Sequence, residues 1–269
     1  MENLGNRILQ DHPWLASRLL SHWISGGTKL GGVRRILFES LVGELDSRYY
    51  RNSCTSEERE RLKALCMGKD SAVQWAKQYL KRGFPEAQTA FLPIFTRLEE
   101  LLSSNSMTVH QVGCCSGREV AYYAKKYPHS RFVGSDCDED LILFLRETWQ
   151  DLPNLSFELL RLENKADIIS QKPCDLLVAS GGFHYLDAAV LQLFFSSARR
   201  FSGKILLSQP LDGHYNAGNI LKSTPRKQMS WNHPYPAYLR STGWKGVEWI
   251  ETFLEGNVLV KNIAAFASS

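Results

Sequence analysis

The sequence lacks the features that mark several large classes of protein. Its 269 residues contain no run of about 20 apolar residues, which a membrane-spanning helix requires. Its charge is nearly balanced, with 32 Lys and Arg against 28 Asp and Glu, and the basic residues are scattered along the chain. The composition therefore predicts neither a membrane partner nor a nucleic-acid partner.

The cysteines also lack any pattern that would indicate a disulfide framework or a zinc site. None of the six is spaced as CxxC. The first residues, MENLGNRILQDHPW, include an early acidic residue and a proline, and they have no long apolar region typical of a signal peptide. We therefore expect a reduced, cytoplasmic protein whose core needs no disulfide or metal.

The pattern of apolar residues changes near residue 105. Upstream, apolar residues recur at helical spacing, and Asp70 and Pro85 are suited to begin helices. The polar stretch SSNSM (103–107) is typical of a linker. The sequence thus predicts a helical N-terminal region at residues 1–106 and a second domain at residues 107–269.

Downstream of the linker, short strand-like runs alternate with helical patterns. These runs are TVHQVG (108–113), RFVGSD (131–136), LSFELL (155–160), CDLLVAS (174–180) and KILLSQP (204–210). Two further strand candidates are joined at Glu255-Gly256-Asn257, which is a hairpin signal. Because alternating strands and helices favour parallel βαβ units, we predict an α/β fold. Its doubly wound, mostly parallel seven-stranded sheet would end in an antiparallel hairpin.

The ends of the first two predicted strands carry the residues suited to a ligand. Open α/β sheets bind ligands beyond the carboxyl ends of their strands. The first strand runs into Gly113-Cys114-Cys115-Ser116-Gly117, where small residues let the backbone approach a ligand and the following helix offers free N–H groups. About twenty residues later the second strand ends at Asp136, whose carboxylate suits the two hydroxyls of a ribose. This spacing indicates an adenosine-bearing cofactor.

These motifs together resemble the class I S-adenosylmethionine-dependent methyltransferases over residues of about 107–210. VHQVGCCSGREVAYYAKKYP is similar to the first motif of that family, and FVGSDCDEDLI is similar to the second, in which Asp136 would hold the ribose. CDLLVASGGFHYLD resembles the fourth strand and the loop that faces the methyl group. The resemblance implies S-adenosyl-L-methionine as cofactor. The residues it implies for binding are Gly113, Cys114, Cys115, Ser116, Gly117, Asp136, Cys137, Arg161, Leu162 and Ser180.

The chain departs from the family pattern at three positions. Gln111 stands where the family usually has an acidic residue for the methionine amine, and Cys115 stands where it usually has glycine. Arg161 stands where an aspartate often contacts the adenine amine, with Glu163 just beyond. A nicotinamide-binding Rossmann protein is the main rival interpretation, but it requires G-x-G-x-x-G and does not predict the antiparallel ending.

Methyl transfer needs a group that aligns the acceptor and removes its proton, which suits histidine or tyrosine. The residues that we predict for this role are His184 and Tyr185, after the fourth strand, His214, after the fifth, and His233, before a later helix. No metal site is expected. The acidic residues from Asp136 to Glu147 have the spacing of a calcium loop, but its sixth position, which requires glycine, is Leu141.

The sequence therefore predicts a methyltransferase that acts on an oxygen, nitrogen or carbon atom of a small molecule. A second reading keeps the cofactor but transfers its aminocarboxypropyl group. A third is a non-catalytic binding protein with a degenerate methyltransferase fold. We expect the N-terminal helices to cover a small-molecule pocket or to build the interface of a homodimer.

Overall fold

The computed structural model describes most of the chain. The described residues are 4–12, 14–16, 18–19, 33–51, 54–55, 62, 71–81, 92–226, 229–254 and 257–269. The expected helix starts at Asp70 and Pro85 lie outside these residues, as do Glu255 and Gly256 of the expected hairpin turn.

The contacts of the chain group it into two compact units. The first comprises Met1–Gln78 with Pro225–Ser230, and the second comprises Tyr79–Thr224 with Trp231–Ser269. The domain boundary near residue 106, which the sequence indicates, stays a prediction.

In the described residues of the first unit, helices α1 (Leu4–Asp11) and α3 (Val33–Tyr49) contact each other. The segment Pro225–Ser230, which comes much later in the chain, belongs to the same unit. Within this unit the Met229 amide donates to Oδ1 of Asp46, on α3, at 2.7 Å. The hydrogen bond fixes a distant part of the chain to the C-terminal half of α3.

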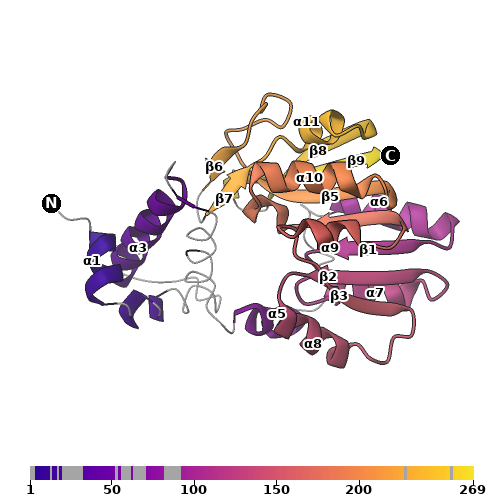
Figure 1. Ribbon diagram of the computed structural model, residues 1–269, viewed down its shortest axis with the longest axis horizontal. Helices are drawn as coiled ribbons and strands as arrows, with labels where there is room; N and C mark the ends of the chain where they lie inside the picture. The colour runs from indigo at the N-terminus through magenta and orange to yellow at the C-terminus, as the bar shows by residue number, and fades with distance from the viewer. Residues whose placement is uncertain are drawn as a thin grey trace. The chain divides into compact units, whose positions relative to one another are not determined.

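The second unit is built on one seven-stranded sheet (Figure 1). Its strands are β1 (Thr108–Val112), β2 (Arg131–Asp136), β3 (Leu155–Leu159), β4 (Cys174–Ser180), β5 (Ser202–Asp212), β8 (Lys245–Leu254) and β9 (Asn257–Ser268). The order across the sheet is β3-β2-β1-β4-β5-β9-β8. The first five strands are parallel, and β9 pairs antiparallel with both β5 and β8. The predicted fold class is confirmed.

The strand order reverses between β1 and β4. From β1 the chain moves outward to β2 and β3, and it then returns to place β4 on the other side of β1. Such a reversal directs the loops after β1 and β4 away from each other and opens a crevice at the carboxyl ends of these strands. The topology therefore predicts a ligand site at the ends of β1 and β4.

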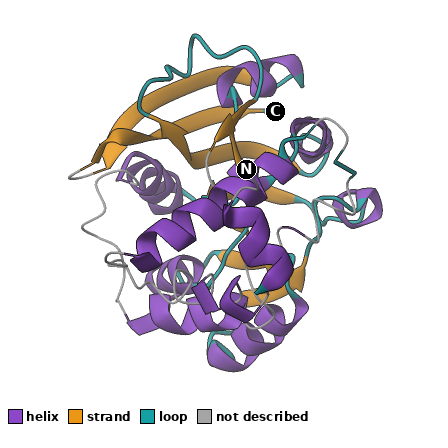
Figure 2. Ribbon diagram, turned by 90° about the vertical axis from the view of Figure 1, so that its left-hand side faces the viewer, coloured by secondary structure: helices purple, strands orange, loops and turns teal. Residues whose placement is uncertain are grey.

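Helices flank the strands (Figure 2). They are α6 (Leu92–Ser104), α7 (Arg118–Lys126), α8 (Glu139–Thr148), α9 (Lys165–Ile169), the short 3₁₀ helix η2 (Phe183–Tyr185), α10 (Ala188–Ala198) and α11 (Tyr235–Ser241). Helix α5 (Ser71–Lys81) spans the division between the two units and lies mostly in the first. A separate two-stranded sheet pairs β6 (Thr224–Arg226) with β7 (Ser230–Asn232). Helices α7 and α8 contact β2 and β3. Among the described helices, none is long and apolar enough to cross a membrane.

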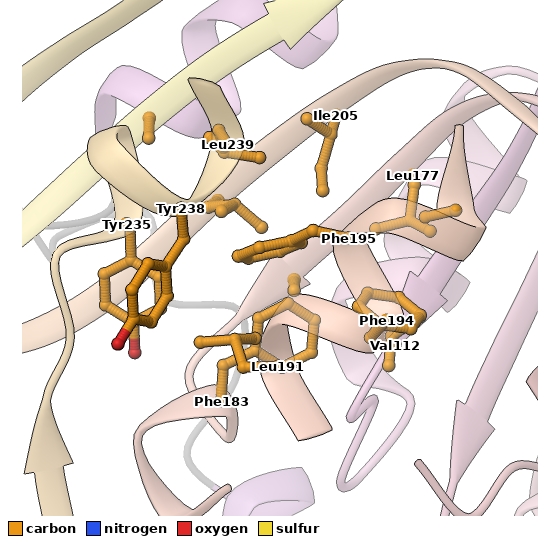
Figure 3. Packing of buried hydrophobic residues seen from close by; sticks show 14 of the residues in the cluster. Val112, Leu177, Phe183, Leu191, Phe194, Phe195, Ile205, Tyr235, Tyr238 and Leu239 are labelled. Atoms are coloured by element: carbon orange, nitrogen blue, oxygen red, sulfur yellow. The ribbon is translucent and has the colours of Figure 1, made fainter. Parts of the chain in front are cut away.

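A cluster of buried apolar residues lies where η2, α10 and α11 meet β4 and β5 (Figure 3). Phe194 and Phe195 of α10 are fully buried there, as is Leu177 of β4. Burying a side chain of this size contributes about 2–3 kcal/mol relative to leaving it in water. The Trp244 indole donates to the Phe195 carbonyl at 2.9 Å, so the polar N–H of this buried side chain also has a hydrogen-bond partner. This core fixes the turn after β4, which carries two of the predicted catalytic residues.

Candidate active site

The loop between β1 and α7 turns through three residues with left-handed backbone. The φ angles are +70° at Gly113, +47° at Cys115 and +65° at Gly117. The amides of Gly113 and Cys114 both donate to the Ser135 carbonyl, at 2.8 and 2.9 Å, and tie the loop to β2. Cys115 thus adopts a conformation that favours glycine, at a cost of about 1–2 kcal/mol.

Aromatic side chains pack closely against the end of this loop. A Cβ atom on Gly117 would lie 2.9 Å from the Phe157 ring and 3.1 Å from Nε1 of Trp149. The same Nε1 donates to the Ser116 carbonyl at 3.2 Å. Glycine at position 117 is therefore required both by its backbone angle and by the space available.

Asp136 closes the loop from the end of β2. Its Oδ2 accepts the Cys115 amide at 3.1 Å, and its Oδ1 accepts the Cys137 amide at 2.8 Å. Burial raises the pKa of this carboxyl, and the two backbone donors lower it. The Cys137 side chain also hydrogen-bonds to this carboxyl. Because the two carboxylate oxygens together have four lone pairs, Asp136 still has capacity to accept a hydrogen bond from a ligand. Asp136 can therefore hold the loop and a ribose at the same time.

Glycines leave room beside the ends of β1 and β4. A Cβ atom on Gly113 would meet its nearest neighbour, the Gly181 carbonyl oxygen, only at 4.0 Å. At Gly181 and Gly182 it would meet nothing within 4 Å. The space lies at the reversal of strand order and next to the loop that Asp136 closes. This arrangement fits a nucleoside-bearing cofactor.

The other predicted cofactor residues have varied surroundings. Cys114 is buried, with its Sγ facing Gly134, and Cys137 is exposed. Leu162 is buried just beyond β3, and Ser180 pairs with Ser208 at the end of β4. Arg161 has its Nη2 3.6 Å from Oε2 of Glu139 on α8, and both side chains are exposed. Their roles in binding stay predictions.

A buried amide fixes the turn after β4. Gln209, fully buried on β5, accepts the Phe183 amide at Oε1 at 3.1 Å. Its Nε2 donates to the carbonyls of Ala179 and Gly181, at 3.2 and 3.0 Å. Three hydrogen bonds thus position the turn that carries His184. Sequence reasoning missed this residue, although an amide inside the apolar run KILLSQP is an available signal.

Two of the predicted catalytic histidines lie on loops at the carboxyl edge of the sheet. His184 is buried on η2, with its ring centroid 4.0 Å from that of Tyr185, which is 37% exposed. His214 is exposed two residues beyond β5, and its ring lies 4.2 Å from that of Tyr215. The His184 loop follows β4, which borders the reversal of strand order. The His214 loop follows β5, the strand next to β4.

His233 has a different environment, because both of its ring nitrogens have partners. Nδ1 lies 2.6 Å from Oγ of Ser223, which is also 2.7 Å from the hydroxyl of Tyr238. Nε2 lies 3.0 Å from the Leu186 carbonyl, to which it donates. Burial lowers the pKa of His233 to about 4, so the ring is neutral at pH 7. It connects α11 to the end of η2.

The described residues contain no cluster of histidine, cysteine and acidic side chains that could hold a metal ion. Asp138, within the acidic stretch that has calcium-loop spacing, caps α8 by accepting the Leu141 amide at 2.8 Å. The presence of an acidic residue at position 138 is therefore explained by its role as a helix cap.

Comparison with known proteins agrees with the geometry. Residues 109–202, from β1 to the first residue of β5, match the family model described as a methyltransferase domain. No protein of curated function matches the sequence significantly.

Solved structures share the fold at low sequence identity. A candidate O-methyltransferase of Nostoc punctiforme PCC 73102 is 12% identical, with a TM-score of 0.58 over 94% of this chain and 72% of its own. The CurJ carbon methyltransferase is 16% identical, with a TM-score of 0.54 over 96% of this chain and 71% of its own. The methyltransferase domain of bacterial CtHen1 is 14% identical, with a TM-score of 0.51 over 66% and 98%.

Residues 109–202 therefore match a methyltransferase domain, and the fold of the chain is the Rossmann-like α/β fold of the solved structures named above. The resemblance found in the sequence is confirmed.

Proposed function

We propose that this protein transfers the methyl group of S-adenosylmethionine to an oxygen, nitrogen or carbon atom of a small molecule. The observation that carries the proposal is the Asp136 carboxylate, which closes the loop at Cys115 and keeps lone pairs for a ribose. The room beside Gly113 and Gly181 supports it. The two proteins of similar fold that are described as an O-methyltransferase and a carbon methyltransferase favour a small acceptor.

The cofactor, when bound, supplies an electrophilic methyl group on a positively charged sulfur. The residues of the chain then align the acceptor and remove its proton if it has one. We assign this role to His184, because Gln209 holds its turn next to the glycines at the end of β4. Tyr185 and His214 would line the acceptor side. His233, with both nitrogens engaged, would keep the loops in place.

Cofactor binding tests the proposal through Asp136. Asp136→Ala should weaken the binding of S-adenosylmethionine by about 1–3 kcal/mol, roughly 5- to 150-fold, because the ribose loses a charged acceptor. Isothermal titration calorimetry measures the change.

Asp138→Ala is the matched control, since it removes the same side chain two residues later. It should lower helix stability by about 1 kcal/mol through loss of the α8 cap, without changing cofactor affinity. Equal affinities for the wild type and Asp136→Ala would remove the basis of the proposal.

Product analysis separates methyl transfer from the alternatives. Incubation with S-adenosylmethionine and a panel of small phenols, amines and activated carbon acids should yield S-adenosylhomocysteine. Formation of methylthioadenosine would instead indicate transfer of the aminocarboxypropyl group. A wild-type protein that binds no S-adenosylmethionine at high micromolar concentration would exclude both enzymes. The homodimer and the cytoplasmic location stay predictions.

A further inference from the structure

A carboxylate on α7 contacts the residue that breaks the family pattern at the end of β1. Glu119 lies in the first turn of α7. Gln111, the penultimate residue of β1 and only 5% exposed, donates from Nε2 to Oε2 of Glu119 at 2.8 Å. Among the described residues this amide is the one side-chain hydrogen-bond partner of Glu119, and no ion pair accompanies it.

The charge of Glu119 is poorly compensated in this environment. Burial is the largest influence on its carboxyl and raises the pKa, while the Gln111 hydrogen bond and the charge of Arg118 lower it less. The charges of Glu119 and Asp136 both raise the pKa of the Cys115 thiol, so both carboxylates lie close to the loop. Asp136 has two backbone donors there, whereas Glu119 has one neutral amide.

The start of a helix favours a carboxylate, but this effect does not explain the direction of Glu119. The comparable acidic residues in the first turn of α8, Glu139 and Asp140, are exposed. They can interact with the helix dipole without leaving water. Glu119 instead lies against the end of β1, where it accepts the Gln111 amide, and close enough to the β1–α7 loop for its charge to act on Cys115. A partly buried carboxylate in such a place is stabilised by a cation.

We propose that Glu119 binds the ammonium group of the methionine portion of the cofactor, and that Gln111 positions this carboxylate from β1. The inference rests on the proposed function and extends it to the end of the cofactor opposite the ribose. A glutamate at position 111 would bring a second carboxylate within about 3 Å of Glu119 and force one of the two to take up a proton. An amide at position 111 and a carboxylate at position 119 therefore belong together.

Titrations with two ligands test the role of Glu119. S-adenosylhomocysteine carries the amino-acid portion, whereas 5′-methylthioadenosine has the adenosine portion without it. Glu119→Gln should weaken S-adenosylhomocysteine at least 10-fold and change the affinity for methylthioadenosine by less than about 2-fold. The exchange variant Gln111→Glu/Glu119→Gln keeps one carboxylate and one amide, so it should regain most of the lost affinity. Glu147→Gln, an exposed change of the same charge on α8, should alter neither affinity.

Thermal unfolding of the unliganded protein separates binding from a structural role. Because burial makes the ionised carboxylate unfavourable, Glu119→Gln should unfold at the same temperature as the wild type or higher. A lower unfolding temperature, together with equal losses for both ligands, would overturn the proposal in favour of a structural role. Unchanged binding of S-adenosylhomocysteine by Glu119→Gln would overturn this inference alone. A wild type that binds neither ligand would overturn the proposed function as well.

Discussion

Two turns at the carboxyl edge of the sheet have similar backbones but different surroundings. The β1–α7 loop and the turn after β4 both use glycines with positive φ, +65° at Gly117 and +77° at Gly181. Gly117 is packed against Phe157 and Trp149, whereas the space around Gly181 is open. The same left-handed backbone therefore occurs once inside a packed layer and once beside open space.

The difference agrees with the roles that we propose for the two turns in binding cofactor and acceptor. The β1–α7 loop is held from both sides, by aromatic packing at Gly117 and by the Asp136 hydrogen bond at Cys115. Gln209 holds the turn after β4 through three hydrogen bonds, and the space beside Gly181 and Gly182 is open. A rigid loop suits a cofactor that is common to many enzymes, and an open turn suits an acceptor that differs between them.

The largest expected effect comes from filling the packed glycine. Gly117→Ala should lower the free energy of unfolding by about 2–5 kcal/mol, because left-handed strain and overpacking against Phe157 add together. Urea denaturation measures the loss. A change below about 1 kcal/mol would mean that the aromatic layer yields and that the two turns do not differ in packing.

The pH dependence of stability compares one buried histidine from each region. Burial lowers the pKa of His110, under the first loop, and that of His233, beside the second turn, to about 4 from 6.5. The unfolded chain therefore binds more protons between pH 6.5 and 4, and stability falls as the pH falls through this window. Each histidine contributes a slope of up to about 1.4 kcal/mol per pH unit, which amounts to roughly 3 kcal/mol per histidine across this window.

Single substitutions separate the contributions of His110 and His233 to the pH dependence of stability. His110→Asn and His233→Asn should each flatten the curve by the slope of one proton, as measured by urea denaturation from pH 7 to 4.5. The carboxyls of Glu119 and Asp136 act in the opposite direction in the wild type, because their raised pKa values make protonation favour the folded state. Curves that stay parallel to the wild type would show that these histidines titrate alike in both states.

The smallest expected effect comes from the open glycine. Gly181→Ala should lower the free energy of unfolding by only about 1–2 kcal/mol, since strain is present and overpacking is absent. The difference between the unfolding free energies lost by Gly117→Ala and by Gly181→Ala then gives the contribution of overpacking against Phe157. Equal losses for the two variants in the same urea titration would contradict the comparison.

Sequence patterns predicted the strands and the β1–α7 loop because these features are local. A strand followed by small residues, and a second strand ending in Asp136, follow from short-range spacing and from the reversal rule for parallel sheets. Cys115, which stands at a glycine position of the family pattern, has a φ of +47°. Asp138, in the stretch with calcium-loop spacing, caps α8.

Contacts between distant segments were not predictable in the same way. Gln209 fixes a turn about 26 residues away, and His233 reaches the Leu186 carbonyl across 47 positions. Nothing in the neighbouring residues shows whether a histidine has a free nitrogen. The pairing of Gln111 with Glu119 also depends on α7 folding back over β1.

Short-range patterns in the sequence are sufficient to predict the alternation of strands and helices, the loop of small residues after β1 and the acidic end of β2, because each depends on neighbouring residues. Only the tertiary structure decided which polar groups are engaged and which face open space. Packing joins segments far apart in the chain, and burial changes the protonation of groups such as His233 and Glu119. The role that we propose for Glu119, as the carboxylate that position 111 does not supply, therefore depends on the contact between α7 and β1.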